Sequence, residues 1–177
     1  MSDFDYAHLI TSVPDYPKPG VVFKDITTLT KDPEGFSRAI NDLADHFADA
    51  GVTKVIGAEA RGFMFAAPVA YRLSAGFVPA RKPGKLPRET LSASYDLEYG
   101  TDCLEIHADA LTPDDTVILV DDLIATGGTA IAQIKLLEEF GAKLAGMAFL
   151  MELDFLNPRE HVSRYTDAEI YSLVHVS

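Results

Sequence analysis

Short apolar runs alternate with amphipathic stretches along most of the chain. The runs are rich in Val, Ile, Leu and Ala, as in strands that are buried on both faces of a sheet. Glycines and prolines punctuate the segments between them. The pattern predicts an α/β fold whose twisted, mostly parallel sheet is flanked by helices. The predicted strands cover residues 54–60, 77–81, 103–107, 116–122, 142–152 and 170–176.

The clearest helix signal covers residues 32–51, "DPEGFSRAINDLADHFADAG". Asp32 suits an N-cap, Pro33 suits the first turn, and Gly51 is a suitable C-terminal stop. Apolar residues recur there at spacings of three and four, which predicts one buried helix face. Further helices are expected over residues 61–76 and 128–141, and a short one over residues 3–12.

Residues 82–102, "KPGKLPRETLSASYDLEYGTD", show neither helical nor strand periodicity. They are expected to form a loop. A loop of this length inside a compact domain is uncommon and is often functional.

Composition narrows the class of protein. A chain of 177 residues is expected to form a single domain, residues 1–177, with a sizeable core. Lys+Arg is 15 and Asp+Glu is 27, a formal net charge of −12. So acidic a chain argues against nucleic-acid partners and against an anionic membrane surface, because both need a basic face.

The location of the protein is predicted from what the sequence lacks. Its one cysteine, Cys103, excludes an internal disulfide and is interpreted as a packing residue. The first residues, "MSDFDYAHLI", do not read as a signal peptide, and no run approaches the ~18 apolar residues of a membrane span. A cytoplasmic location is therefore expected by default.

The most informative stretch is "VILVDDLIATGGTA", residues 117–130. Ligands of open α/β sheets bind beyond the carboxyl ends of the strands, where Asp121 and Asp122 are expected to lie. Their carboxylates accept hydrogen bonds from vicinal sugar hydroxyls or from the water shell of a metal. The Gly-rich turn that follows opens a helix, whose free N–H groups attract an anion. The pattern fits a ribose 5-phosphate, bound in addition by Ala125, Thr126, Gly127, Gly128 and Thr129.

Other interpretations of this stretch are weaker. An aspartate N-cap before a tight turn would explain a lone acidic pair, but not the adjoining "TGGT". The stretch is not a Walker A loop, because no GK[ST] follows, and it lacks the GxGxxG of a dinucleotide fingerprint.

The stretch "VILVDDLIATGGT" resembles the phosphoribosyl-pyrophosphate motif of type I phosphoribosyltransferases. Three further blocks are similar to the adenine-specific branch of that family: "GVVFKDITTLTKDP", "GAEARGFMFAAPVA" and "SYDLEYGTDCLEIHADAL". The four blocks follow the family's order, and the resemblance covers roughly residues 10–155.

The resemblance implies a fold and a reaction. The fold would be the type I phosphoribosyltransferase fold, with a small N-terminal hood mainly within residues 1–35 and a mobile active-site loop at about 83–102. The reaction, part of purine salvage, would convert adenine and 5-phosphoribosyl 1-pyrophosphate into AMP and pyrophosphate through an oxocarbenium-like transition state. Mg²⁺ would be held mainly by the substrate, so no protein-only metal site is expected. A homodimer is also implied.

By the same resemblance, "EARG", residues 59–62, is the pyrophosphate loop, with Glu59, Ala60 and Arg61 at the pyrophosphate. Family members often have a non-proline cis peptide near Ala58 to Ala60. The basic segment 80–88 follows a predicted strand end, and Arg81, Lys82 and Lys85 would help to neutralise the departing pyrophosphate. Pro83 departs from the basic residue expected at its position.

The remaining implied roles concern the base. Phe23 would stack on adenine, while Val22 and Lys24 offer backbone groups to its polar edge. Glu98 would exchange a proton with adenine N7, which requires a pKa raised by burial. Tyr99 would help to close the loop, and Arg61 is counted with these two as catalytic.

Two alternatives stay open. The base could be xanthine, hypoxanthine, guanine or orotate, although those relatives do not usually share the "VVFKDI" and "LEYG" blocks. The protein could instead be a regulator that senses phosphoribosyl pyrophosphate, although its charge and short N-terminal segment argue against a DNA-binding head.

The histidines show no metal-ligand spacing and are interpreted as structural or surface residues: His8, His46, His107, His161 and His175.

Overall fold

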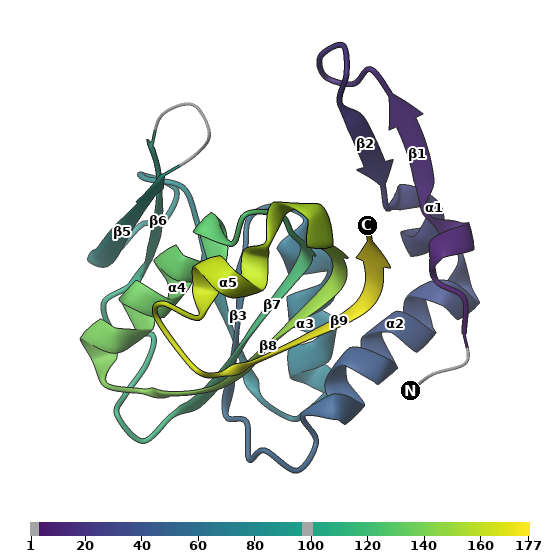
Figure 1. Ribbon diagram of the computed structural model, residues 1–177. Helices are drawn as coiled ribbons and strands as arrows, with labels where there is room; N and C mark the ends of the chain where they lie inside the picture. The colour runs from purple at the N-terminus through teal and green to yellow at the C-terminus, as the bar shows by residue number, and fades with distance from the viewer. Residues whose placement is uncertain (1–3, 97–100) are drawn as a thin grey trace.

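The fold is built on a five-stranded sheet whose strands are all parallel (Figure 1). The computed structural model describes residues 4–96 and 101–177. The strand order is β4-β3-β7-β8-β9, so β7 lies at the centre with β3 and β8 beside it. The sheet confirms the fold class predicted from the apolar runs. The strands are β3 (Lys54–Ala58), β4 (Gly76–Ala80), β7 (Thr116–Ile124), β8 (Lys143–Leu153) and β9 (Glu169–Val176).

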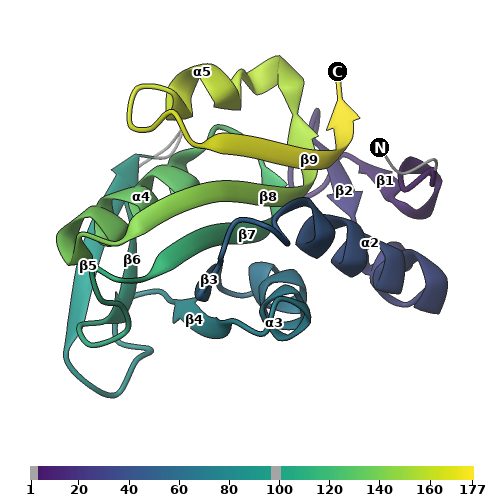
Figure 2. The same cartoon turned by 90° about the horizontal axis from the view of Figure 1, so that it is seen from below.

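Helices cover both faces of this sheet. Helices α2 (Pro33–His46) and α3 (Gly62–Arg72) lie on one side, and α4 (Gly128–Phe140) lies on the other, as Figure 2 shows. The short segments η2 (Asp154–Leu156) and α5 (Pro158–Val162), which no pattern in the sequence predicted, connect β8 to β9. None of the helices among the described residues is long and apolar enough to cross a membrane.

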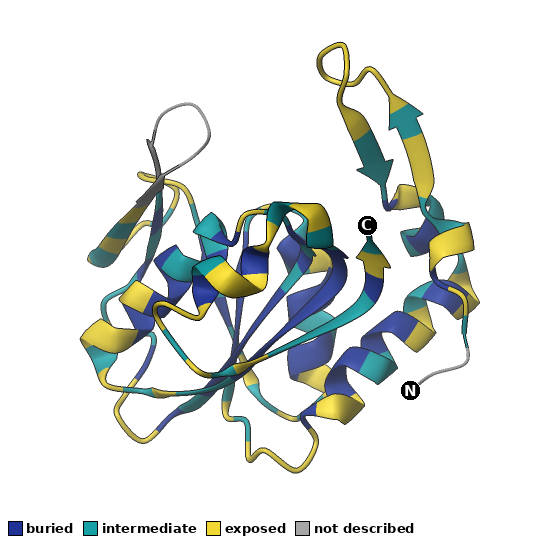
Figure 3. Cartoon of the chain, in the orientation of Figure 1, coloured by how far each residue is buried: buried dark blue, intermediate teal, exposed yellow. Residues whose placement is uncertain are grey.

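The core consists of two apolar layers that the sheet separates. Along β7, Ile118 packs toward α2 and α3, whereas its neighbour Leu119 packs toward α4. Along β3, Val55 and Ile56 divide in the same way, and all four residues are fully buried. Successive side chains of a strand point to opposite faces, so both faces of these strands are buried (Figure 3).

Helix α2 begins as predicted and ends earlier. The Asp32 side chain accepts a hydrogen bond from the Gly35 N–H at 2.7 Å, and Pro33 occupies the first turn. The helix stops at His46, and a series of turns carries the chain to Gly51, whose φ is +66°. Gly51 therefore ends the connecting turn and not the helix.

The N-terminal segment differs from its prediction. Residues 3–12 were expected to form a helix, but only Ala7–Leu9 form a 3-10 turn, labelled η1. Thr11–Pro14 form β1, which pairs antiparallel with β2 (Val22–Asp25), and α1 (Thr27–Thr30) follows. The hairpin of β1 and β2 projects away from the sheet in Figure 1. Thr11 and Val13 are poor helix formers, and the prolines that follow direct this segment into a hairpin.

The predicted loop over residues 82–102 is wrong in its second half. Thr90–Asp96 form β5, which pairs antiparallel with β6 (Thr101–His107). Leu91 and Ala93 pack on the α4 side of the core, whereas Ser92 and Ser94 are exposed. This alternation has period two, but its small side chains make it weak, and cross-strand pairing with β6 decides the conformation.

Candidate active site

A cavity of about 280 Å³ lies at the carboxyl end of β7. Its walls come from the tip of β7, from the turn of residues 125–129, named here the phosphate turn, and from residues 59–61 after β3. The ends of neighbouring parallel strands meet at one edge of a sheet, so these segments converge although they are far apart in sequence.

The phosphate turn presents free N–H groups at the start of α4. Gly127 precedes the helix with φ +88°, a conformation that favours glycine. Among the described residues, the N–H groups of residues 127–129 donate to no other protein group. Such donors at the positive end of a helix of thirteen residues make an anion site.

Two adjacent carboxylates face the cavity beside this turn. The Asp122 N–H donates to Asp121 Oδ1 at 2.8 Å, and Arg61 Nε lies 3.0 Å from Asp122 Oδ2. Burial raises the pKa of Asp121 well above its usual range, and the neighbouring Asp122 charge raises it further. Burial also raises the pKa of Asp122, which Arg61 opposes. The site therefore stabilises positive charge or hydroxyl donors in front of the pair.

Arg61 and Gly62 position this pair from the start of α3. A Cβ on Gly62 would lie 2.6 Å from Asp121 Oδ1, so glycine leaves the room that the carboxylate occupies. Arg61 precedes the helix, and its guanidinium carbon lies 5.4 Å from the ring centre of Phe23. Arg61 thus connects the carboxylates to the N-terminal hairpin.

The pyrophosphate loop predicted over residues 59–62 has an unusual backbone. The Glu59–Ala60 peptide is cis, within the segment where the family resemblance implied such a bond. Glu59 Oε1 accepts a hydrogen bond from the Lys82 N–H at 2.6 Å and lies 3.3 Å from Arg81 Nε. The Lys82 hydrogen bond, with Arg81, holds the pKa of Glu59 below its usual value. The loop and the basic segment after β4 are therefore joined.

The structure brings most of the predicted site residues to one cavity. Its lining includes the following of them: Glu59, Ala60, Arg61, Lys82, Asp121, Asp122, Ala125, Thr126, Gly127, Gly128 and Thr129. The lining does not include Arg81, Lys85, Val22, Phe23 or Lys24. Glu98 and Tyr99 lie outside the described residues.

Other residues at the site were not foreseen. Leu104, Phe149 and Gln133 also line the cavity. Gln133 is 2 % exposed, and among the described residues its Nε2 has no hydrogen-bond partner. The sequence signal that could have identified Gln133 is its polar side chain within the otherwise apolar stripe of the helix. His161, interpreted as a structural or surface residue, places Nδ1 3.0 Å from the Thr126 carbonyl oxygen.

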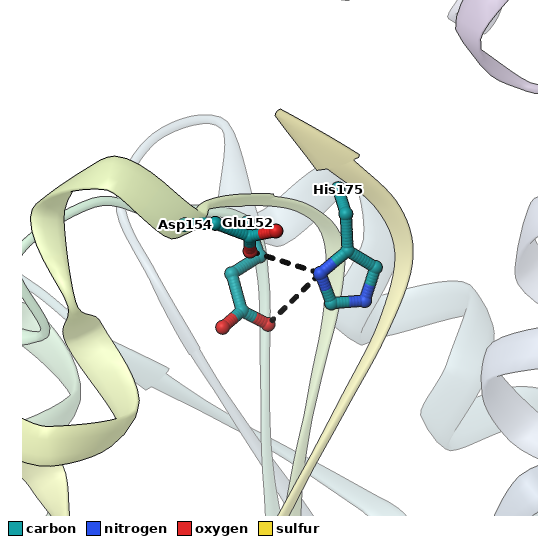
Figure 4. A group of neighbouring side chains, drawn as sticks. All are labelled: Glu152, Asp154 and His175. Carbon is teal, nitrogen blue, oxygen red and sulfur yellow. Dashed lines mark hydrogen bonds and ion pairs between the residues drawn. The ribbon is translucent and has the colours of Figure 1, made fainter. Parts of the chain in front are cut away.

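A second polar group lies near the end of the sheet, where Figure 4 shows Glu152, Asp154 and His175. Their potential ligand atoms lie within 4.8 Å of one another, an arrangement that a cation could use. However, Arg159 already donates to both Glu152 oxygens, each at 2.8 Å, and brings its own positive charge. The group is better explained as an ion-pair network than as a metal centre.

The family model described as "Phosphoribosyl transferase domain" matches residues 25–171. The adenine phosphoribosyltransferase of Acidobacterium capsulatum is 54 % identical over 169 residues, which cover 96 % of this chain and 92 % of the relative. The adenine phosphoribosyltransferase of Escherichia coli is 53 % identical over 165 residues, which cover 93 % and 90 %.

Solved structures agree with these relatives. The crystal structure of adenine phosphoribosyltransferase from Thermoanaerobacter pseudethanolicus has a TM-score of 0.91 at 48 % identity and covers 97 % of this chain and 98 % of that one. The Giardia lamblia enzyme, complexed with 9-deazaadenine, has a TM-score of 0.92 at 35 % identity and covers 100 % and 99 %.

Proposed function

Because this chain belongs to the phosphoribosyltransferase family, in its adenine phosphoribosyltransferase branch, we propose that it converts adenine and 5-phosphoribosyl 1-pyrophosphate into AMP and pyrophosphate. This membership confirms the recognition, the fold class and the enzyme class predicted from the sequence. The observation that supports this reaction is a single cavity lined by the acidic pair, the phosphate turn and the pyrophosphate loop.

The sugar phosphate would lie between the acidic pair and the phosphate turn. Asp121 and Asp122 accept hydrogen bonds from the ribose hydroxyls, because ionised carboxylates only accept. The N–H groups of residues 127–129 and the hydroxyls of Thr126 and Thr129 bind the 5-phosphate. In this assignment the free N–H groups of the phosphate turn and the carboxylates of the acidic pair bind opposite ends of the same sugar phosphate.

The pyrophosphate would lie at residues 59–61, where Arg61 and Lys82 supply positive charge. Arg81 and Lys85 lie just outside the cavity lining and belong to the segment that Glu59 holds. We assign these two a supporting electrostatic role on the departing pyrophosphate. Charge placed where negative charge develops lowers the barrier of the reaction.

The adenine would lie between the hood and the sheet. We assign the hood to the N-terminal segment within residues 1–35, where the β1–β2 hairpin carries Val22, Phe23 and Lys24. Phe23 is half-buried and already contacts Arg61. An aromatic face beside the pyrophosphate loop suits a purine ring. The Giardia lamblia relative, whose structure holds 9-deazaadenine, supports a purine pocket in this fold.

The chemical step breaks the bond between C1 of the ribose and the pyrophosphate oxygen, and adenine N9 forms the new bond to C1. Asp121 and Asp122 orient the sugar and stabilise its oxocarbenium-like character. Glu98 accepts the proton that adenine N7 loses as N9 attacks, and Tyr99 helps to exclude water, which would otherwise hydrolyse the sugar. The roles of Glu98 and Tyr99 stay predictions from the family resemblance.

Mg²⁺ fits the oxygen donors at this site. The acidic pair offers carboxylate oxygens, the ligands that Mg²⁺ prefers, and would contact the ion through its water shell while the substrate holds it. When bound, Mg²⁺ would neutralise the negative charge of the pyrophosphate.

We also propose a single-domain enzyme that works as a cytoplasmic homodimer. The side chains of Met64 and Tyr71 are exposed on α3, seven residues apart and therefore on one side of the helix, with Tyr71 88 % exposed. An exposed aromatic residue on a helix is typical of a subunit interface. Light scattering of the purified protein at two concentrations tests the dimer.

A coupled assay tests the function. It supplies phosphoribosyl pyrophosphate, Mg²⁺ and either adenine, hypoxanthine, guanine, xanthine or orotate, and compares Glu98→Gln with the unmodified protein. Turnover with adenine alone, reduced at least about 100-fold in the variant, supports both the base and the proton-transfer role. Turnover with another base would contradict the adenine assignment. Binding of phosphoribosyl pyrophosphate without turnover of any base would favour the sensing regulator.

A further inference from the structure

Helix α5 contacts the phosphate turn from outside the cavity. His161 Nδ1 lies 3.0 Å from the carbonyl oxygen of Thr126, 35 residues earlier in the chain. The adjacent Val162 is buried, and a Cβ on Gly127 would lie 2.8 Å from Val162 Cγ2. Two neighbouring residues of α5 therefore contact two neighbouring residues of the turn.

The direction of the His161 hydrogen bond follows from its partner. A carbonyl oxygen only accepts hydrogen bonds, so Nδ1 of His161 must carry the hydrogen. This assignment holds whether the imidazole is neutral or protonated. The bond therefore orients the Thr126 carbonyl in both states.

Orienting this carbonyl also orients the next N–H. In a planar trans peptide, the carbonyl of Thr126 and the N–H of Gly127 point in opposite directions. Thr126 and Gly128 line both the active-site cavity and a second hollow of about 360 Å³ that His161 also lines. The turn thus separates the two hollows, and a carbonyl that points to His161 directs the Gly127 N–H toward the active-site cavity.

We propose that His161 is a positioning residue for the 5-phosphate. Its Nδ1–H holds the Thr126–Gly127 peptide in the orientation that presents the Gly127 N–H to the phosphate. This inference rests on the proposed assignment of the phosphate turn, and it adds a residue outside the cavity that determines affinity for phosphorylated sugars.

Helix α5 is itself held in place by the network around Glu152. A helix of five residues is not stable by its own hydrogen bonds. The Arg159 guanidinium donates twice to buried Glu152 on β8, and the Ser172 hydroxyl on β9 donates to Glu152 at 2.8 Å. His175 on β9 lies 2.9 Å from Asp154, as the dashed line in Figure 4 marks. The sheet thus fixes α5, and α5 fixes the turn.

The test compares two substitutions of similar size. His161→Asn keeps a side-chain N–H at the distance from Cα at which Nδ1 lies, whereas His161→Leu removes every donor. We expect His161→Leu to raise KM for phosphoribosyl pyrophosphate and Kd for AMP by about three- to tenfold, the range of one lost hydrogen bond. We expect kcat at saturation, KM for adenine and Tm to stay close to those of the unmodified protein. His161→Asn should restore both affinities.

Two further variants separate the possible outcomes. Ser163→Ala removes a hydroxyl of the same segment that, among the described residues, donates to the Glu160 carbonyl oxygen, and it should leave all constants unchanged. Thr129→Val removes a hydroxyl of the turn itself. If Thr129→Val weakens AMP binding but His161→Leu does not, the inference about His161 is wrong and the phosphate assignment stands. If neither weakens it, the phosphate assignment fails. A fall in kcat and Tm with KM unchanged would assign His161 to the fold alone and overturn the proposal.

Discussion

The pairing of Arg159 with Glu152 gives a stability prediction whose size follows from burial. Glu152 is 2 % exposed, and Arg159 Nε and Nη2 lie 2.8 Å from its two oxygens. The hydrogen bonds that Arg159 donates to Glu152 raise the pKa of Arg159. Replacing Arg159 with methionine keeps the apolar stem of the side chain but removes both donors, which leaves the buried Glu152 carboxylate with the Ser172 hydroxyl at 2.8 Å and His175 Nδ1 at 3.9 Å.

The expected cost lies between two known limits. An exposed ion pair contributes about 0–1 kcal/mol, whereas breaking a buried pair costs about 3–5 kcal/mol. The Arg159 side chain is half exposed, so water compensates part of the loss. We expect Arg159→Met to lower the free energy of unfolding by about 2–3 kcal/mol. For a chain of this length that loss corresponds to a fall in Tm of about 4–12 °C.

Urea unfolding and thermal scans measure this effect, with a matched control on the same segment. Arg164→Met removes an exposed guanidinium that lies 2.9 Å from Glu160, and it should cost less than about 0.5 kcal/mol. Adding Glu152→Gln to Arg159→Met should recover at least about 1 kcal/mol, because the buried charge is then gone. Equal losses for Arg159→Met and Arg164→Met, or no recovery in the double variant, would refute the reasoning.

The active site yields two further predictions. Asp121→Asn should abolish turnover and stabilise the unliganded protein at neutral pH. Burial and the neighbouring Asp122 raise the pKa of Asp121 in the native state above its value in the unfolded state. Between these two pKa values the native state binds one more proton than the unfolded state, so the stability of the unmodified protein falls as pH rises. Urea unfolding from pH 4 to 8 checks this, and parallel pH profiles for the variant and the unmodified protein would contradict it. Gly127→Ala places a side chain at φ +88° against Val162, so it should cost about 1–3 kcal/mol of stability and raise KM for phosphoribosyl pyrophosphate but not for adenine. Urea unfolding and steady-state kinetics with each substrate varied measure the two effects, and an unchanged KM for phosphoribosyl pyrophosphate would count against the assigned turn.

The active site illustrates how stability and binding oppose each other. Asp122 is buried and the adjacent Asp121 is partly buried, and the raised pKa of each reflects a carboxylate removed from water. In the proposed reaction these acceptors meet ribose hydroxyls and the water shell of Mg²⁺, which compensate for the lost hydration. The acidic pair thus lowers the stability of the free protein and becomes favourable when the substrate binds.

The sequence by itself determined the features that depend on neighbouring residues. The apolar run ending in Asp121 and Asp122, followed by the glycine turn, predicted a strand, an acidic pair and a turn that opens a helix, and the structure places all of them on one cavity. The N-cap Asp32 and the buried strands β3, β7 and β8 also followed from local pattern. These signals are readable because strand period, caps and helix N-termini involve residues that are adjacent in the chain.

Only the tertiary structure decided which distant residues act together. The pairing of β5 with β6, the contact of Glu59 with Arg81 and the bond from His161 to Thr126 join residues 5 to 35 positions apart. No local periodicity records such contacts, because their energy arises when the sheet brings strand ends and connections to the same edge. For this reason, the sequence alone indicates an ordinary surface histidine at position 161, although in the folded chain it contacts the turn that we propose binds the phosphate.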